Sequence, residues 1–213
     1  MLSRTLSPGM VALDIGAHVG FYGVFMAHLV GRSGRVYCFQ PHRRNYRLLR
    51  RNLRANRFHW AEAYNLALSD RTGTARLSLN PLNDGGHSLG SFANNPDLIG
   101  YDGDEPKKLV ETTALDEFIR AKGIERVDFI KIDVEGAETL VFAGASKLLS
   151  GPYAPVICAE VGDKAQEQFG KTERDLREQL YAYGYRSFFL GPQLVEFGRS
   201  TPVEGLPNIC FRK

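Results

Sequence analysis

One short turn constrains the fold of this chain more than any other feature. The stretch VALDIGAHVGFYGVFMAHLV, residues 11–30, passes from an apolar run into a helical pattern through a segment with two glycines. Residues 11–15 are apolar apart from Asp14, which is typical of a strand buried on both faces. A buried strand that leads directly into a helix predicts an α/β fold, with a mostly parallel sheet covered by helices on both faces.

The same alternation continues along the 213 residues, which we expect to form a single domain, 1–213. Strands are expected at 11–15, 35–39, 63–68, 127–132, 156–161, 186–190 and 208–212. Helices are expected at 18–30, 42–56, 115–122, 137–149 and 173–183. No helical pattern separates the last two strands, so these should be antiparallel. Residues 80–109 have little periodicity and are expected to form a long loop or insertion.

Charge and cysteine content exclude some classes of protein. A net charge of +3 is too small to indicate a nucleic-acid-binding protein by itself. The cysteines at 38, 158 and 210 lack the spacing of metal ligands and lie in apolar runs, so buried thiols are expected. Their odd number, without a signal-peptide pattern, predicts a cytoplasmic protein. The longest apolar run, residues 21–30, is too short to span a membrane.

Seven arginines are concentrated between Arg43 and Arg57, and six of them lie in the helix expected at 42–56. Tyr46, Leu49 and Leu53 recur at helical spacing and should face the core, so the arginines cover the remaining surface. Such a stripe can bind phosphates. A solvated helix face is the commoner arrangement, and no aromatic residues for base stacking are interleaved. Nucleic acid is therefore not the expected partner.

The first turn is a candidate ligand site, because ligands of open α/β sheets bind at the carboxyl ends of the strands. It lacks the G-x-G-x-x-G pattern of dinucleotide sites, since Ala17, His18 and Val19 separate Gly16 from Gly20. Asp14 would repel a pyrophosphate and favour a ligand with an ammonium group. S-adenosylmethionine has an ammonium group, a sulfonium and no phosphate. Gln40, after the second strand, could hold the hydroxyls of its ribose.

Five stretches resemble the FkbM-type family of S-adenosylmethionine-dependent methyltransferases: SPGMVALDIGAHVGFYG, VYCFQP, NLALSD, LDEFI and VDFIKIDVEGAE. The resemblance implies a class I methyltransferase (Rossmann-like) fold: a seven-stranded, mostly parallel sheet with an antiparallel last strand and helices on both faces. It also implies transfer of a methyl group to a hydroxyl, often on a sugar or a secondary metabolite. Residues 80–109 could then cover the acceptor site. Family members often have more residues before the first strand, so part of the usual cover of the acceptor site is expected to be missing here.

The turn and the resemblance together give a set of cofactor-binding candidates: Asp14, Gly16, Ala17, His18, Gly20, Gln40, Ala67, Leu68, Asp70 and Asp133. Two of these depart from the family pattern: Gln40 stands where the family usually has Glu, and His18 stands where it usually has Asn. Glutamine loses a charge-assisted hydrogen bond to the ribose, so weaker cofactor binding is expected.

The catalytic candidates are Asp133, Glu135, His18 and His87, because a hydroxyl acceptor must lose a proton as the new bond forms. Asp133 is favoured as the acid/base or substrate-orienting residue, and Glu135 is a candidate to orient the acceptor. Glu138 is expected to be structural. The spacing requires no metal ion. Two alternatives remain open: an RNA or protein methyltransferase that uses the basic helix, and a non-catalytic binding module whose cofactor site has decayed at Gln40.

Overall fold

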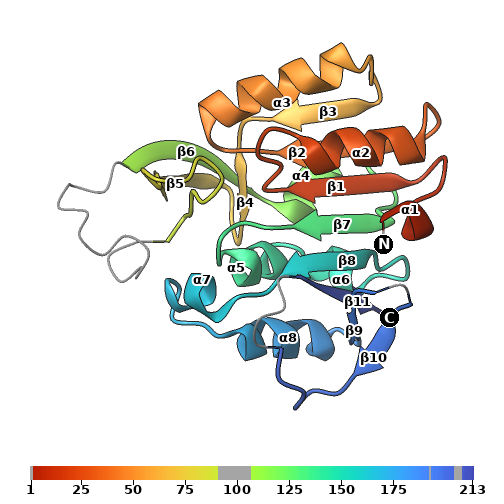
Figure 1. The fold of residues 1–213 in the computed structure, drawn as a ribbon, viewed down its shortest axis with the longest axis vertical. Coiled ribbons are helices and arrows are strands. Elements are labelled where there is room, and N and C mark those ends of the chain that lie inside the picture. Colours follow the sequence, from red (N-terminus) through yellow and green to blue (C-terminus); the bar gives the residue numbers. More distant parts are fainter. Residues whose placement is uncertain (1, 91–106, 192, 204–207) are drawn as a thin grey trace.

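The structure is a computed structural model that describes residues 2–90, 107–191, 193–203 and 208–213. Within these residues the main sheet has eight strands in the order β10-β9-β11-β8-β7-β1-β2-β3 (Figure 1). Their bounds are β1 (Val11–Ile15), β2 (Arg35–Phe39), β3 (Ala61–Tyr64), β7 (Phe129–Ile132), β8 (Val156–Glu160), β9 (Arg186–Phe189), β10 (Val195–Phe197) and β11 (Asn208–Arg212).

The strand directions confirm a mostly parallel sheet with an antiparallel last strand. β3, β2, β1, β7 and β8 are parallel, and β11 lies antiparallel between β8 and β9. The expected number of seven strands is wrong. The short strand β10 pairs antiparallel with β9 and adds an eighth strand at the edge.

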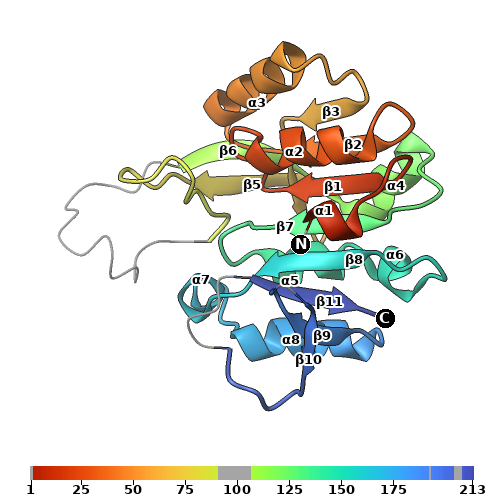
Figure 2. The same ribbon diagram turned by 45° about the vertical axis from the view of Figure 1, so that its right-hand side comes forward.

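Helices cover both faces of the sheet, as expected (Figures 1 and 2). Their bounds are α1 (Leu2–Thr5), α2 (Phe21–Val30), α3 (Arg43–Ala55), α4 (Leu115–Lys122), α5 (Glu138–Ala143), α6 (Ser146–Ser150), α7 (Asp163–Glu167) and α8 (Glu173–Ala182). Successive residues of a strand point to opposite faces. Ala12 therefore packs in one core with residues of α2 and α3, whereas Leu13 and Ile15 pack in the other with α4, α5, α6 and α8.

A second, three-stranded sheet extends beyond the carboxyl ends of the main strands (Figure 1). It contains β4 (Ala67–Ser69), β6 (Lys107–Ala114) and β5 (Gly73–Ser78). The single strand expected at 63–68 is wrong, because the chain leaves the main sheet at Asn65. The Asn65 side chain donates hydrogen bonds to the carbonyls of Gln40 and Pro41, at 2.9 and 2.7 Å. Pro41 has no N–H group with which to extend the ladder.

The loop expected at 80–109 is also wrong in part. Residues 107–109 belong to β6, and Ser88 forms an isolated β-bridge with Ser78 at the end of β5. The rest of the expected insertion, residues 91–106, lies outside the described residues.

Two predicted helices differ from the structure by more than a one-residue shift of their ends. α2 begins at Phe21 rather than at His18, because His18 has a φ of 48°. The helix expected at 137–149 is divided at Gly144 into α5 and α6. A Cβ atom on Gly144 would lie 2.2 Å from the backbone oxygen of Ser69 in β4. Because β4 approaches so closely, the residue at which the predicted helix is divided must be glycine.

The remaining expectations concern cysteines and membranes. All three cysteines are free and buried, as expected. None of the described helices combines the length and the apolar character that crossing a membrane requires.

Candidate functional site

The turn after β1 brings the ends of three strands together. Gly16 has a φ of 82°, and the N–H groups of Gly16 and Ala17 both donate to the carbonyl of Phe39 in β2, at 3.1 and 2.9 Å. A Cβ atom on Gly16 would lie only 1.8 Å from the backbone oxygen of Asp133, just after β7. Glycine at this position therefore allows the end of β1 to lie directly against the end of β7.

The other glycines of this region have packing roles. A Cβ atom on Gly20 would lie 2.6 Å from Leu49 Cδ1, so glycine at this position allows the start of α2 to pack closely against α3. Gly23 makes the close approach to the sheet, where a Cβ atom would lie 2.7 Å from Cys38 Sγ.

His18 has left-handed backbone geometry, with a φ of 48°. Asn, Asp and His are the non-glycine residues most enriched in this region. His18 is therefore a residue type that accepts the backbone geometry required here. The side chain is half-buried and lies near the segment at Gly85.

A pocket lies at this carboxyl edge of the sheet. Seven of the predicted site residues line it: Gly16, Gln40, Ala67, Leu68, His87, Asp133 and Glu135. Five others do not: Asp14, Ala17, His18, Gly20 and Asp70. The sequence did not identify several further lining residues, among them Phe39, Pro41, Asn45, Leu66, Leu77, Asp84 and Leu89.

The lining is divided between apolar and acidic residues. β2, β4 and β5 contribute Phe39, Ala67, Leu68 and Leu77, whereas the turn after β7 contributes Asp133 and Glu135. With Asp84, three carboxylates line the pocket, and no lysine or arginine is among its described lining residues, although Lys131 pairs with Asp133 and Arg44 with Asp84. This lining disfavours phosphate groups and favours a ligand with an apolar part and a positive charge.

Asp14 lies beneath α2 instead of on the pocket surface. It is 1% exposed, and neither carboxylate oxygen makes a hydrogen bond of normal geometry within the described part of the chain. Burial raises its pKa to about 7, although the positive charge of Lys131, its neighbour in register on β7, acts in the opposite direction. Direct contact with a ligand, as expected from the sequence, would require this carboxylate to become accessible.

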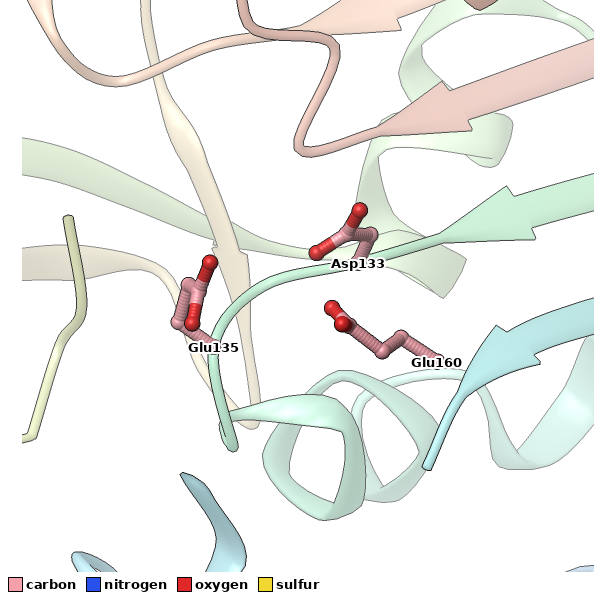
Figure 3. A group of neighbouring side chains, drawn as sticks. All are labelled: Asp133, Glu135 and Glu160. Carbon is pink, nitrogen blue, oxygen red and sulfur yellow. The ribbon is translucent and has the colours of Figure 1, made fainter. Parts of the chain in front are cut away.

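Asp133 lies beside Glu160 (Figure 3) and also pairs with a cation, Lys131. Lys131, whose side chain is buried, places Nζ 2.6 Å from Asp133 Oδ2. Burial opposes ionisation of Asp133, but the hydrogen bond with Glu160 and the charge of Lys131 lower its pKa. Burial and the same hydrogen bond raise the pKa of Glu160. Glu160 therefore holds the proton of this pair and Asp133 the negative charge.

Glu160 was missed by the sequence interpretation. The sequence does contain a feature that points to it: Glu160 is the acidic last residue of the apolar run VICAE in β8, at the same edge of the sheet as Asp133.

Glu135 occupies the tip of the turn after β7, with a left-handed φ of 53°. Burial raises its pKa to about 7, and the nearby charge of Asp133 acts in the same direction. Oxygens of Asp133, Glu135 and Glu160 lie within 4.8 Å of one another, which is close enough to hold a metal ion. Lys131 already pairs with Asp133 Oδ2 and Glu160 holds a proton, so too few carboxylate oxygens remain free for us to assign a metal there.

Glu138 stabilises the turn that carries these residues. Its Oε1 accepts a hydrogen bond from the Val134 N–H at 2.9 Å, and its Oε2 accepts one from Gln166 Nε2 at 2.6 Å. With 1% exposure and both oxygens engaged, Glu138 has the geometry of the structural residue predicted from the sequence.

Gln40 is held in one orientation at the end of β2. Its Oε1 accepts a hydrogen bond from the His42 N–H at 2.8 Å. Its Nε2 makes no hydrogen bond to a described residue, so this donor is available to a ligand. A glutamate here would present an acceptor instead.

His87 reaches the pocket, but both ring nitrogens have partners. Nδ1 accepts a hydrogen bond from the Asn80 N–H at 3.1 Å, and Nε2 lies 3.1 Å from His42 Nδ1. This arrangement leaves His87 no free nitrogen with which to accept a proton from a substrate.

Comparisons with known proteins agree with these features. The sequence model of the methyltransferase FkbM domain matches residues 14–187. The 2-O-methyltransferase NoeI of Sinorhizobium fredii (strain NBRC 101917 / NGR234) is 29% identical over 161 residues, 70% of this chain and 63% of NoeI. The 31-O-demethyl-FK506 methyltransferase FkbM of Streptomyces tacrolimicus is 29% identical over 178 residues, 74% of this chain and 67% of that protein. The chain thus spans less than two thirds of the length of NoeI.

Two solved structures show the fold. The methyltransferase FkbM from Methylobacillus flagellatus KT has a TM-score of 0.60 at 15% identity, covering 97% of this chain and 44% of that chain. The O-methyltransferase from Bacillus cereus in complex with SAH has a TM-score of 0.53 at 16% identity, covering 94% of this chain and 72% of that one. These similarities confirm the class I methyltransferase fold.

Proposed function

Because the chain belongs to the FkbM family of methyltransferases, we propose that it transfers a methyl group from S-adenosylmethionine to a hydroxyl of a small molecule, on a sugar or a secondary metabolite. The observation that carries this proposal is the pocket at the carboxyl edge, with three carboxylates and neither lysine nor arginine among its described lining residues. The names of two relatives, a 2-O-methyltransferase and a 31-O-demethyl-FK506 methyltransferase, support oxygen as the methylated atom.

The residues present fit this methyl donor. The Gly16 turn, where no Cβ atom has room, allows a ligand to approach the backbone beside Asp133. The free Nε2 donor of Gln40 suits a ribose hydroxyl, and Ala67 and Leu68 supply an apolar surface for adenine. The carboxylates after β7 favour the positively charged methionine end.

When bound, S-adenosylmethionine supplies a methyl group on a positively charged sulfur. The chain must then hold the acceptor in line with that methyl group and take up the proton of its hydroxyl. We assign proton uptake to Glu135, whose pKa of about 7 suits a general base near neutral pH. Asp133, ionised and fixed by Lys131 and Glu160, is assigned to orient the reacting groups.

The basic helix gives less support to an RNA acceptor. Arg44 of α3 pairs with Asp84 at 2.6 Å, and the arginines of α3 are exposed, as in a solvated helix face. We therefore favour the small acceptor over the RNA or protein alternative.

Calorimetry with S-adenosylmethionine and with NAD tests the proposal. The protein should bind S-adenosylmethionine and not NAD, and Gly16→Ala should abolish binding because its Cβ atom would collide with Asp133. Gly123→Ala is the matched control, since Gly123 has a φ of 63° but nothing within 4 Å of a Cβ atom. A folded wild-type protein that binds no S-adenosylmethionine would exclude the function, and labelled methyl transfer to a panel of glycosides and polyketide-like alcohols would then identify the acceptor.

A further inference from the structure

Residues 80–90, which we name the strap, lie over the part of the pocket assigned to the nucleoside. Asp84, Gly85, His87 and Leu89 contribute to the pocket lining. The strap follows β5 and comes to the start of α3, so its position depends on contacts between segments that are distant in sequence.

Two groups of contacts attach the strap to the rest of the molecule. At one end, Asn45 Nδ2 donates to the Asp84 carbonyl at 2.7 Å, and Arg44 pairs with the Asp84 carboxylate. At the other end, Ser88 Oγ donates to the Glu135 carbonyl at 2.8 Å. These contacts connect the strap both to α3 and to the turn that carries the acidic residues.

Between these ends, the strap is held by two histidines. The rings of His42 and His87 are nearly perpendicular, with centroids 4.3 Å apart, and His87 Nε2 lies 3.1 Å from His42 Nδ1. The backbone N–H of His42 donates to Gln40 Oε1, so the residue that contacts the strap also fixes the orientation of Gln40.

The hydrogen bonds define the protonation state of the pair. His87 Nδ1 accepts from the Asn80 N–H, so the proton of a neutral His87 must be on Nε2, where it is donated to His42 Nδ1. A proton added to His87 Nδ1 would face the Asn80 N–H, and one added to His42 Nδ1 would face the His87 N–H. The pair can therefore form only when both rings are neutral.

We propose that His42 and His87 are positioning residues for the methyl donor: as a neutral, hydrogen-bonded pair they hold the strap over the nucleoside end of the pocket and keep Gln40 in place. The inference rests on the proposed function, because it assumes that S-adenosylmethionine occupies this pocket.

The charges around the pair indicate the pH range in which it should dissociate. Burial lowers the pKa of His87 to about 4, and His42, His18 and Lys108 act in the same direction, whereas Asp84 opposes them. Burial also lowers the pKa of His42, and the charges of Lys108 and Arg44 lower it further. The charge of Asp84 and a hydrogen bond with Asn45 raise it. A released histidine regains its ordinary value of 6.5, so protonation favours release as the pH falls from about 6.5 towards 4.

The test compares the Kd of S-adenosylmethionine for the wild type and for His42→Ala at pH 8 and pH 5. At pH 8, loss of the hydrogen bond should raise Kd about tenfold in the variant. At pH 5 the wild-type pair is already weakened, so the ratio of the two Kd values should approach one. The ratio is the diagnostic quantity, because protonation of Glu135 also weakens the binding of a cation at low pH in both proteins.

Two further variants control for unspecific effects. His42→Asn keeps an acceptor near the position of Nδ1 and is a good N-cap for α3, so its Kd at pH 8 should stay within about threefold of wild type. His28→Asn, at an exposed histidine of α2, should leave Kd unchanged at both pH values.

Hydrogen exchange without ligand gives a readout that is independent of the cofactor. The Asn80 amide, which is bonded to His87 Nδ1, should lose protection in His42→Ala at pH 8 and in the wild type at pH 5. Unchanged Asn80 protection in His42→Ala, or a Kd ratio that is the same at both pH values, would overturn the inference. Absence of S-adenosylmethionine binding at either pH would overturn the proposed function and with it the role in positioning, even if Asn80 lost protection as expected.

Discussion

Glu135 combines left-handed backbone geometry with a carboxylate that loses its proton near neutral pH. Because its pKa is raised to about 7, the residue is protonated at lower pH and cannot accept a proton there. We predict that the rate of methyl transfer rises about tenfold per pH unit below 7 and becomes constant above it. Glu135→Gln should lower kcat by about 10²- to 10⁴-fold and remove this pH dependence.

A pH–rate profile at saturating methyl donor and acceptor checks this prediction. Glu125→Gln, at an exposed acid distant from the pocket, is the control and should retain the wild-type profile. A wild-type rate that does not change between pH 5 and 8 would show that Glu135 is not the proton acceptor.

The site residues differ in how far the sequence alone could identify them. Asp133 and Glu135 follow a buried strand in a motif that resembles a family pattern, so both could be found before the structure was known. Glu160 meets Asp133 only because β8 lies beside β7, and strand order is not encoded in the local sequence. Asp14 looked like a ligand contact because it is polar at a strand end, but its side chain points to the α2 side of the sheet.

At the scale of elements, Gly144 is the junction between α5, α6 and the second sheet. Gly144→Ala should lower the free energy of unfolding by about 1–3 kcal/mol, because a Cβ atom would lie 2.2 Å from the Ser69 oxygen and displace β4. Urea denaturation measures this loss. Gly162→Ala is the control, since its φ is −150° and nothing lies within 4 Å of a Cβ atom. Equal stability of the two variants would contradict the prediction.

The central strands could be predicted because each is a short apolar run, bounded by turn residues, at the middle of a sheet. β5 and β6 were missed because the first half of each is largely exposed and has no apolar alternation. The end of β3 was missed for another reason. Asn65 ends it through hydrogen bonds to the carbonyls after β2, which are distant in sequence.

At the scale of the whole molecule, the two ends of the parallel strands carry different features. The carboxyl edge carries the pocket, the strap and the second sheet, whereas both termini lie at the opposite edge (Figure 1). The antiparallel strands β11 and β10 complete the sheet, but the segment between them has no regular structure in its described part. The completed sheet therefore depends on contacts that fix this segment against α8.

Arg177 of α8 provides those contacts. It is 2% exposed, and its guanidinium donates to the carbonyls of Gly198, Arg199 and Thr201 at 3.0, 2.7 and 3.0 Å. A lysine has the same charge but only one nitrogen, so it cannot reach three carbonyls in different directions. Arg177→Lys should therefore lower the free energy of unfolding by about 2–4 kcal/mol, because the buried cation loses hydrogen bonds that the guanidinium makes in several directions.

Urea denaturation of Arg177→Lys and of Arg174→Lys separates this effect from a general loss of arginine in α8. Arg174 is exposed on the same helix, so its replacement should change the free energy of unfolding by less than about 0.5 kcal/mol. If the two variants were equally stable, the segment before β11 would not depend on Arg177. If only Arg177→Lys is destabilised, a single buried cation holds the last strand of the sheet in place. From the sequence alone, this arginine would be taken for a surface residue.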